Sequence, residues 1–206
     1  MSQITTGIRR VLSSPQVYRL LQNFLGGKPA RETLCGRYFN IEQVRRVIDI
    51  GCGPADILEV IPERIHYSGF DASGEYIEFA RNKYRQRDAQ FHNHIVDSHN
   101  INQYGLFDLA LATGVLHHLS DDDALELFKI AKRSLAVNGR LVTIDPCYVD
   151  KQSLISRKLV AGDRGQNVRI AIDYQHLAEQ VFDRVELHHH NNLLRVPYDH
   201  AVLICE

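Results

Sequence analysis

From about residue 44 onward, short apolar runs rich in β-branched residues alternate with longer stretches in which apolar residues recur every three or four positions. The short runs are typical of buried strands, and the longer stretches are typical of amphipathic helices. The predicted strands are 44–50, 66–70, 91–96, 107–113, 140–144, 184–190 and 201–205. Their regular alternation with helices predicts an α/β domain in which helices cover both faces of a mostly parallel sheet.

Polar capping residues mark several of the expected helices. Ser73 and Asp173 each precede an apolar-periodic stretch, and Ser120 precedes three acidic residues that favour a helix N-terminus. We therefore expect a helix after each of these three residues. Asn138-Gly139 is expected to end the helix that begins at Ser120. Further helices are expected at 54–61 and 151–160.

The first 43 residues lie outside the repeating pattern. Ser14-Pro15 is expected to begin an amphipathic helix that carries Tyr18 and ends at Gly26-Gly27, and a second helical piece is expected at 32–39. A membrane-surface anchor is disfavoured because the apolar face is short and only modestly charged. We divide the chain into an N-terminal helical extension or lid, residues 1–43, and a single globular domain, residues 44–206.

Composition narrows the class of protein. The chain has 24 Lys and Arg against 25 Asp and Glu, so it lacks the excess of positive charge that non-specific nucleic-acid binding requires. Its four cysteines are far apart and form no CxxC pair, which argues against a disulfide framework or a zinc site and favours a reducing, cytoplasmic location. No apolar run approaches the roughly 20 residues of a membrane span. A small-molecule substrate is the expectation that remains.

A glycine turn follows the first predicted strand. Asp49 ends the apolar run, and Gly51 and Gly53 follow one residue apart, so the chain turns sharply where its backbone can approach a ligand. Asp71 lies twenty residues after Gly51, directly behind the second predicted strand. An α/β nucleotide-binding fold places there the acid that accepts hydrogen bonds from ribose hydroxyls. The two signals together predict an adenosine-type ligand.

From residue 44 to the C-terminus, the order of these motifs resembles the Rossmann-like (class I) S-adenosylmethionine-dependent methyltransferases that act on small molecules. The usual turn of that family carries a third glycine, and Ala55 stands in its place here. The resemblance implies a three-layer fold around a seven-stranded, mostly parallel sheet whose last strand, 201–205, is antiparallel. It also implies S-adenosylmethionine as cofactor and S-adenosylhomocysteine as its product.

The resemblance assigns residues to the parts of that cofactor. The glycine turn would pass under the methionyl part, Asp71 would hold the ribose, and Asp97 with Ser98 would meet the adenine edge. Thr113-Gly114 would face the methionyl amine. The full cofactor set expected on this basis is Asp49, Gly51, Cys52, Gly53, Asp71, Ala72, Asp97, Ser98, Thr113 and Gly114.

Candidate catalytic residues follow the fourth and fifth predicted strands. His117 titrates near neutral pH and is a candidate base or substrate contact, and Asp145 is the second catalytic candidate. The expected acceptor contacts are Tyr18, His117, Tyr148, Arg164 and Arg169, the two arginines because guanidinium groups pair with carboxylate or phosphate. The run His188-His189-His190 is not expected to bind metal, because successive strand side chains point to opposite faces.

Two other functions stay open. One is a catalytically silent cofactor-binding or partner subunit on the same fold, since fold does not fix function. The other is a nicotinamide-dependent oxidoreductase, although Asp56 would place a carboxylate near the pyrophosphate of that cofactor. Neither the acceptor atom, whether oxygen, nitrogen or carbon, nor the oligomeric state follows from the sequence.

Overall fold

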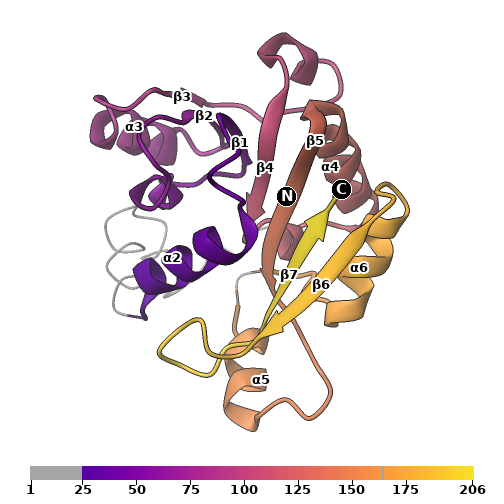
Figure 1. Ribbon diagram of the computed structural model, residues 1–206. Helices are drawn as coiled ribbons and strands as arrows, with labels where there is room; N and C mark the ends of the chain where they lie inside the picture. The colour runs from indigo at the N-terminus through magenta and orange to yellow at the C-terminus, as the bar shows by residue number, and fades with distance from the viewer. Residues whose placement is uncertain (1–24, 164) are drawn as a thin grey trace.

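The computed structural model of the protein describes residues 25–163 and 165–206, and its centre is a seven-stranded sheet in the order β3-β2-β1-β4-β5-β7-β6 (Figure 1). β7 runs antiparallel to both of its neighbours, β5 and β6, whereas the pairings among β1 to β5 are parallel. The strands are β1 (Arg46–Ile50), β2 (His66–Phe70), β3 (Ala89–His92), β4 (Phe107–Thr113), β5 (Leu135–Pro146), β6 (Val185–His190) and β7 (His200–Cys205). The predicted seven-stranded sheet with an antiparallel last strand is confirmed.

Helices and short 3-10 turns connect the strands. Ser73 and Ser120 cap α3 and α4 as expected, their hydroxyls accepting hydrogen bonds from the backbone N–H groups of Tyr76 and Asp123. The α-helices are α2 (Gly27–Tyr38), α3 (Gly74–Lys83), α4 (Asp121–Ser134), α5 (Leu154–Ala161) and α6 (Ala171–Glu179). The 3-10 turns are η2 (Asp56–Glu59), η3 (Ile101–Tyr104) and η4 (Leu116–His118). Among the described residues, no helix has the length and apolar character needed to cross a membrane.

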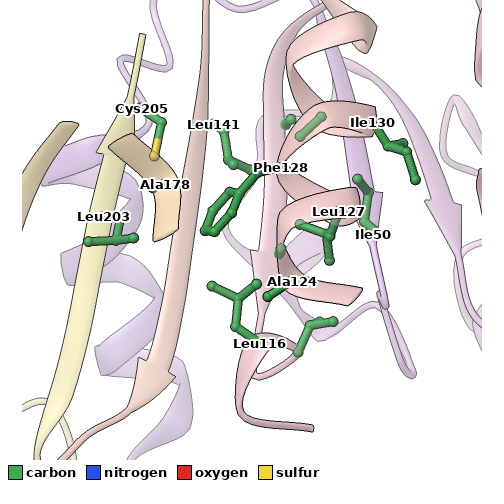
Figure 2. Packing of buried hydrophobic residues seen from close by; sticks show 14 of the residues in the cluster. Ile50, Leu116, Ala124, Leu127, Phe128, Ile130, Leu141, Ala178, Leu203 and Cys205 are labelled. Carbon is green, nitrogen blue, oxygen red and sulfur yellow. The ribbon is translucent and has the colours of Figure 1, made fainter. Parts of the chain in front are cut away.

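The sheet is buried on both faces, which makes the fold three-layered. Successive strand residues such as Val47 and Ile48 are fully buried yet belong to different apolar clusters, because strand side chains alternate between faces. One cluster contains side chains of α4 and α6, among them Phe128 and Tyr174. Figure 2 shows Phe128 of α4 beside Leu141 of β5 in this cluster, with Leu127 on the side of Ile50. The other cluster contains side chains of α2, η2 and α3.

Some predicted boundaries were wrong. The third strand ends at His92 instead of residue 96. The α4 helix ends at Ser134, before Asn138-Gly139, because β5 begins at Leu135 and pairs there with Phe107 of β4. The register of β5 against β4 then shifts between Phe107 and Leu109, and Asn138, within the irregular part of β5, has a left-handed φ of 66°.

Three predicted helix boundaries also differ from the structure. The helix expected at 54–61 is only the four-residue η2, because Ala55 adopts the left-handed conformation with a φ of 56°. Asp173 lies within the first turn of α6, and Ile170 occupies the N-cap position without a side-chain cap. Gly27 begins α2, with Gly26 as its N-cap, and the rest of the helix expected before it lies outside the described residues.

Candidate functional site

The glycine turn lies at the edge of the sheet where β1, β2, β4 and β5 end. Gly51 and Gly53 both have left-handed backbone angles, with φ values of 76° and 54°. A Cβ atom on Gly51 would lie 2.6 Å from Cγ2 of Val115, whereas one on Gly53 would meet no described atom within 4 Å. Gly51 is therefore required for close packing against the segment after β4. Nothing in the described part of the chain covers Gly53, so its backbone is accessible there to a ligand.

Asp71 links this turn to the start of α3. Its Oδ2 atom accepts a hydrogen bond of 2.9 Å from the Gly53 backbone N–H, and its Oδ1 atom accepts one of 2.8 Å from Ser73. Burial raises the pKa of Asp71, and these two hydrogen bonds partly offset that effect. Asp71 therefore lies against the turn, as the predicted ribose-binding acid should, and it also fixes the backbone of the turn.

Asp49 is buried beneath the turn. Its Oδ2 atom accepts a hydrogen bond of 2.6 Å from the Tyr67 hydroxyl, but its Oδ1 atom has no hydrogen-bond partner among the described residues. Burial raises the pKa of Asp49 to about 7, although the Tyr67 hydrogen bond lowers it. Buried polar atoms are rarely left unpaired in folded proteins, so this oxygen suits a donor supplied by a ligand. The neighbouring Cys52 is also buried.

Asp97 and Ser98 follow β3 at a distance of several residues. The Asp97 carboxylate accepts hydrogen bonds from the backbone N–H groups of His99 and Asn100, at 2.8 Å and 2.9 Å. These bonds hold the pKa of Asp97 below its usual value. Asp97 therefore shapes the loop before η3, and its predicted contact with adenine stays a prediction, as does that of Ser98.

His117 and Asp145 come together at the ends of β4 and β5, as two catalytic candidates should. His117 Nδ1 lies 2.7 Å from Asp145 Oδ1, and the His117 backbone N–H donates to the same oxygen at 3.1 Å. The opposite ring nitrogen, Nε2, lies 3.1 Å from Oδ1 of Asp163. Only 6% of the His117 side chain is exposed. The imidazole is thus held between two carboxylates.

The two carboxylates favour the protonated, positively charged form of His117. Burial alone would lower its pKa, but the hydrogen bonds and charges of Asp145 and Asp163 outweigh burial and raise the pKa to about 9. The same contacts hold the pKa of Asp163 well below its usual range despite burial. Ionised carboxylates only accept hydrogen bonds, so both ring nitrogens donate. With this pKa the imidazole is protonated at neutral pH and can donate from both nitrogens, and the predicted role of His117 as a base or substrate contact stays a prediction.

Arg169 is held against the η4 turn. Its guanidinium donates to the backbone carbonyls of Leu116 and Leu119 at 2.9 Å and 2.8 Å. It also donates twice to Oδ1 of Asp121, at 2.9 Å and 2.7 Å. Arg169 thereby positions the segment that carries His117. Its predicted contact with the acceptor stays a prediction.

The other predicted cofactor and acceptor residues have fewer contacts that bear on their predicted roles, or lie outside the described residues. Tyr148 follows β5, donates its backbone N–H to the Arg169 carbonyl at 3.0 Å, and has the Arg157 guanidinium 5.9 Å from its ring centroid. Tyr18 and Arg164 lie outside the described residues. Thr113 ends β4, and Ala72 adjoins Asp71 at the same edge of the sheet. No group of three His, Cys, Asp or Glu side chains among the described residues is arranged to hold a metal ion.

Sequence reasoning missed the role of Asp163 and of its partner Tyr198, whose hydroxyl donates to Asp163 Oδ2 at 2.7 Å. Asp163 lies 46 residues after His117 in a polar loop, and Tyr198 follows another loop just before β7. No local spacing connects them. Only the fold brings Asp163 to His117 and Tyr198 to Asp163.

Comparison with known proteins agrees with this geometry. Residues 48–141, which run from β1 into β5, match a family model described as a methyltransferase domain. The match covers just under half of the chain. The matched segment includes the glycine turn, Asp71 and His117. The search of curated protein sequences finds no match.

Several solved structures share the fold of this chain. A putative O-methyltransferase from Nostoc punctiforme PCC 73102 is 16% identical, with a TM-score of 0.69 over 100% of this chain and 63% of that one. Human N-acetylserotonin methyltransferase, solved in complex with SAM, is 15% identical, with a TM-score of 0.67 over 93% and 54%. The plantazolicin methyltransferase BpumL, in complex with a triazolic desmethylPZN analog and SAH, is 15% identical, with a TM-score of 0.69 over 96% and 90%.

These likenesses establish the Rossmann-like class I methyltransferase fold for this chain. They differ in how much of each relative is matched. The chain spans 54% of the length of the human enzyme and 63% of the length of the Nostoc protein, so it matches only part of these structural relatives.

Proposed function

We propose that the protein transfers a methyl group from S-adenosylmethionine to a small-molecule acceptor. The observation that carries this proposal is the glycine turn of a methyltransferase domain, with Gly53 facing open space and Asp71 hydrogen-bonded to it. The unpaired oxygen of Asp49 beneath the turn adds a buried acceptor for a cationic or N–H group of a ligand. These groups fit the ends of a charged, ribose-containing cofactor.

In this proposal the cofactor lies along the edge formed by the ends of β1, β2 and β4. The backbone of Gly51, Cys52 and Gly53 passes under its methionyl part, and Thr113-Gly114 borders the same part from β4. Asp71 and Ala72 hold the ribose, and Asp97 with Ser98 borders the adenine. When bound, the cofactor supplies a methyl group already activated by a sulfonium.

The residues around this edge have two tasks: to align the acceptor with the methyl carbon and to exclude water. Alignment alone can contribute about 7–11 kcal/mol to the barrier reduction, so an obvious base is not required. His117, positioned by Asp145, and Tyr148 lie at the ends of β4 and β5, where the acceptor would approach. Tyr18, Arg164, Arg169 and the extension at 1–43 complete the proposed acceptor side.

Calorimetry with S-adenosylmethionine, S-adenosylhomocysteine and NAD tests the cofactor. We expect micromolar binding of the first two and none of NAD. Purified protein incubated with methyl-labelled cofactor and a metabolite extract then tests transfer. Binding without transfer to any extract would favour a silent subunit, and binding of NAD alone would favour an oxidoreductase.

A further inference from the structure

The carboxylate of Asp163 accepts hydrogen bonds from two side chains in the part of the site where the methyl acceptor is proposed to bind. Its Oδ1 atom lies 3.1 Å from His117 Nε2, and its Oδ2 atom accepts a hydrogen bond of 2.7 Å from the Tyr198 hydroxyl. The backbone N–H of Gly165 also donates to Oδ1, at 2.9 Å. Two side chains from distant parts of the chain thus hold the two oxygens of one carboxylate. We call His117 Nε2 and the Tyr198 hydroxyl the donor pair.

Both members of the donor pair are fixed as donors. Asp145 accepts from Nδ1 of His117, which leaves Nε2 of the imidazolium to donate outward. Burial and the charge of Asp163 hold the pKa of Tyr198 above its usual range, so its hydroxyl stays protonated. A protonated imidazole and a phenol suit an anion with two acceptor oxygens.

The donor pair borders the proposed cofactor site. A Cβ atom on Gly114 would lie 3.7 Å from Cε1 of His117, and Val115 packs directly on Gly51 of the glycine turn. The Asp163 side chain is 26% exposed whereas that of His117 is 6% exposed. Asp163 therefore lies on the solvent side of the imidazole, between His117 and an approaching molecule.

We propose that the donor pair binds a carboxylate of the methyl acceptor and that Asp163 fills this place until the acceptor arrives. The proposal rests on the proposed methyltransferase function and specifies its substrate class as a carboxylic acid. Exchange of one carboxylate for another keeps the charge around the imidazolium unchanged. A neutral or cationic acceptor would instead leave a buried charged donor unpaired, which is costly.

Chemical rescue tests the donor pair without knowledge of the natural acceptor. Asp163→Ala removes the internal carboxylate, and the titration of His117 is followed by NMR of its imidazole. We expect the His117 pKa to fall by at least one unit in Asp163→Ala, and millimolar acetate to restore it while acetamide does not. Asp150→Ala removes an exposed aspartate from the same connection between β5 and α6 and should leave the titration unchanged.

The role of Tyr198 is tested in the same background. Adding Tyr198→Phe to Asp163→Ala should weaken acetate binding several-fold, because one donor of the pair is lost. If Asp163→Ala does not fold, Asp163→Gly, which also vacates this place, provides the same comparison in the presence of acetate. An absence of acetate rescue, or equal rescue by acetamide, would overturn the proposal.

A second arm tests the acceptor. Methyl-labelled cofactor is presented with an extract divided into acidic and non-acidic fractions by anion exchange, and label is expected in the acidic fraction only. Label confined to the non-acidic fraction would overturn the carboxylate proposal while leaving methyl transfer intact. Failure of the protein to bind S-adenosylmethionine in calorimetry would instead overturn the proposed function itself.

Discussion

The carboxylate of Asp71 accepts a 2.9 Å hydrogen bond from the backbone N–H of Gly53. The two residues come from different strand ends, Gly53 after β1 and Asp71 after β2. The contact therefore sets the glycine turn in place before any ligand arrives. Preorganisation of this kind reduces the ordering cost of binding.

Asp71→Ala should weaken S-adenosylmethionine binding, because it removes both the proposed ribose contact and the support of Gly53. Loss of a charge-assisted hydrogen bond of about 1.5–3 kcal/mol corresponds to roughly one to two orders of magnitude in Kd. Calorimetry measures this directly. Asp88→Ala, at an exposed aspartate before β3, is the control and should bind like wild type. Equal affinities would show that Asp71 does not contact the ribose.

Gly51→Ala should destabilise the fold by at least about 2 kcal/mol. The new Cβ would lie 2.6 Å from Val115 Cγ2, and the residue would have to keep a φ of 76°. Gly36→Ala is the matched control, because a Cβ at this helical position meets no described atom within 4 Å. That substitution should stabilise α2 by about 0.5–1 kcal/mol. Urea denaturation of both variants gives the two free energies, and similar values would contradict this account.

Arg169→Ala should lower the free energy of unfolding by about 2–3 kcal/mol, because the carbonyls of Leu116 and Leu119 lose their charged donor. Arg157→Ala removes an exposed arginine of α5 and should change stability little. Thermal unfolding in the absence of any acceptor compares the two. If Arg169→Ala is as stable as wild type, the guanidinium does not hold η4, and a direct contact with the acceptor becomes its better explanation.

The stability of the protein should depend on pH through His117. Its folded pKa of about 9 exceeds the usual value of 6.5, so proton binding stabilises the folded state. This stabilisation is complete below about pH 6.5 and is lost as the pH rises through 9. Thermal unfolding between pH 7 and 9.5 should show a steeper decline for wild type than for His117→Gln.

The comparison isolates His117 because the other groups are common to both proteins. The polar and charged groups that face the imidazole are Asp145 near the end of β5, Asp163, and the ring of His118, whose centroid lies 3.9 Å away. Burial also raises the pKa of several thiols, whose ionisation in the unfolded chain contributes equally to both proteins. Parallel declines for the two proteins would show that His117 is not charged in the folded state.

The sequence predicted the layers of this fold because burial of both sheet faces leaves a continuous apolar signal in each strand. It also placed His117 and Asp145 after the fourth and fifth predicted strands, and the structure brings the two side chains together because β4 and β5 end at the same edge. It did not predict the left-handed Ala55, which shortens the following helix to η2, because no side chain there encodes that angle. Nor did it predict Asp163 beside His117, because loop positions depend on tertiary packing that no periodicity records.

The position of β7 has a consequence for the order in which the molecule can assemble. β7 lies between β5 and β6 in the sheet but follows both along the chain. When a ribosome has delivered β6, β7, its one pairing partner among the described strands, has not yet been made, and β5 still presents an open edge to β7. Pairing of β5, β6 and β7 with one another must therefore wait for residues 200–205, so the parallel part from β1 to β5 can form during synthesis, whereas β6 and β7 join it in a single late step.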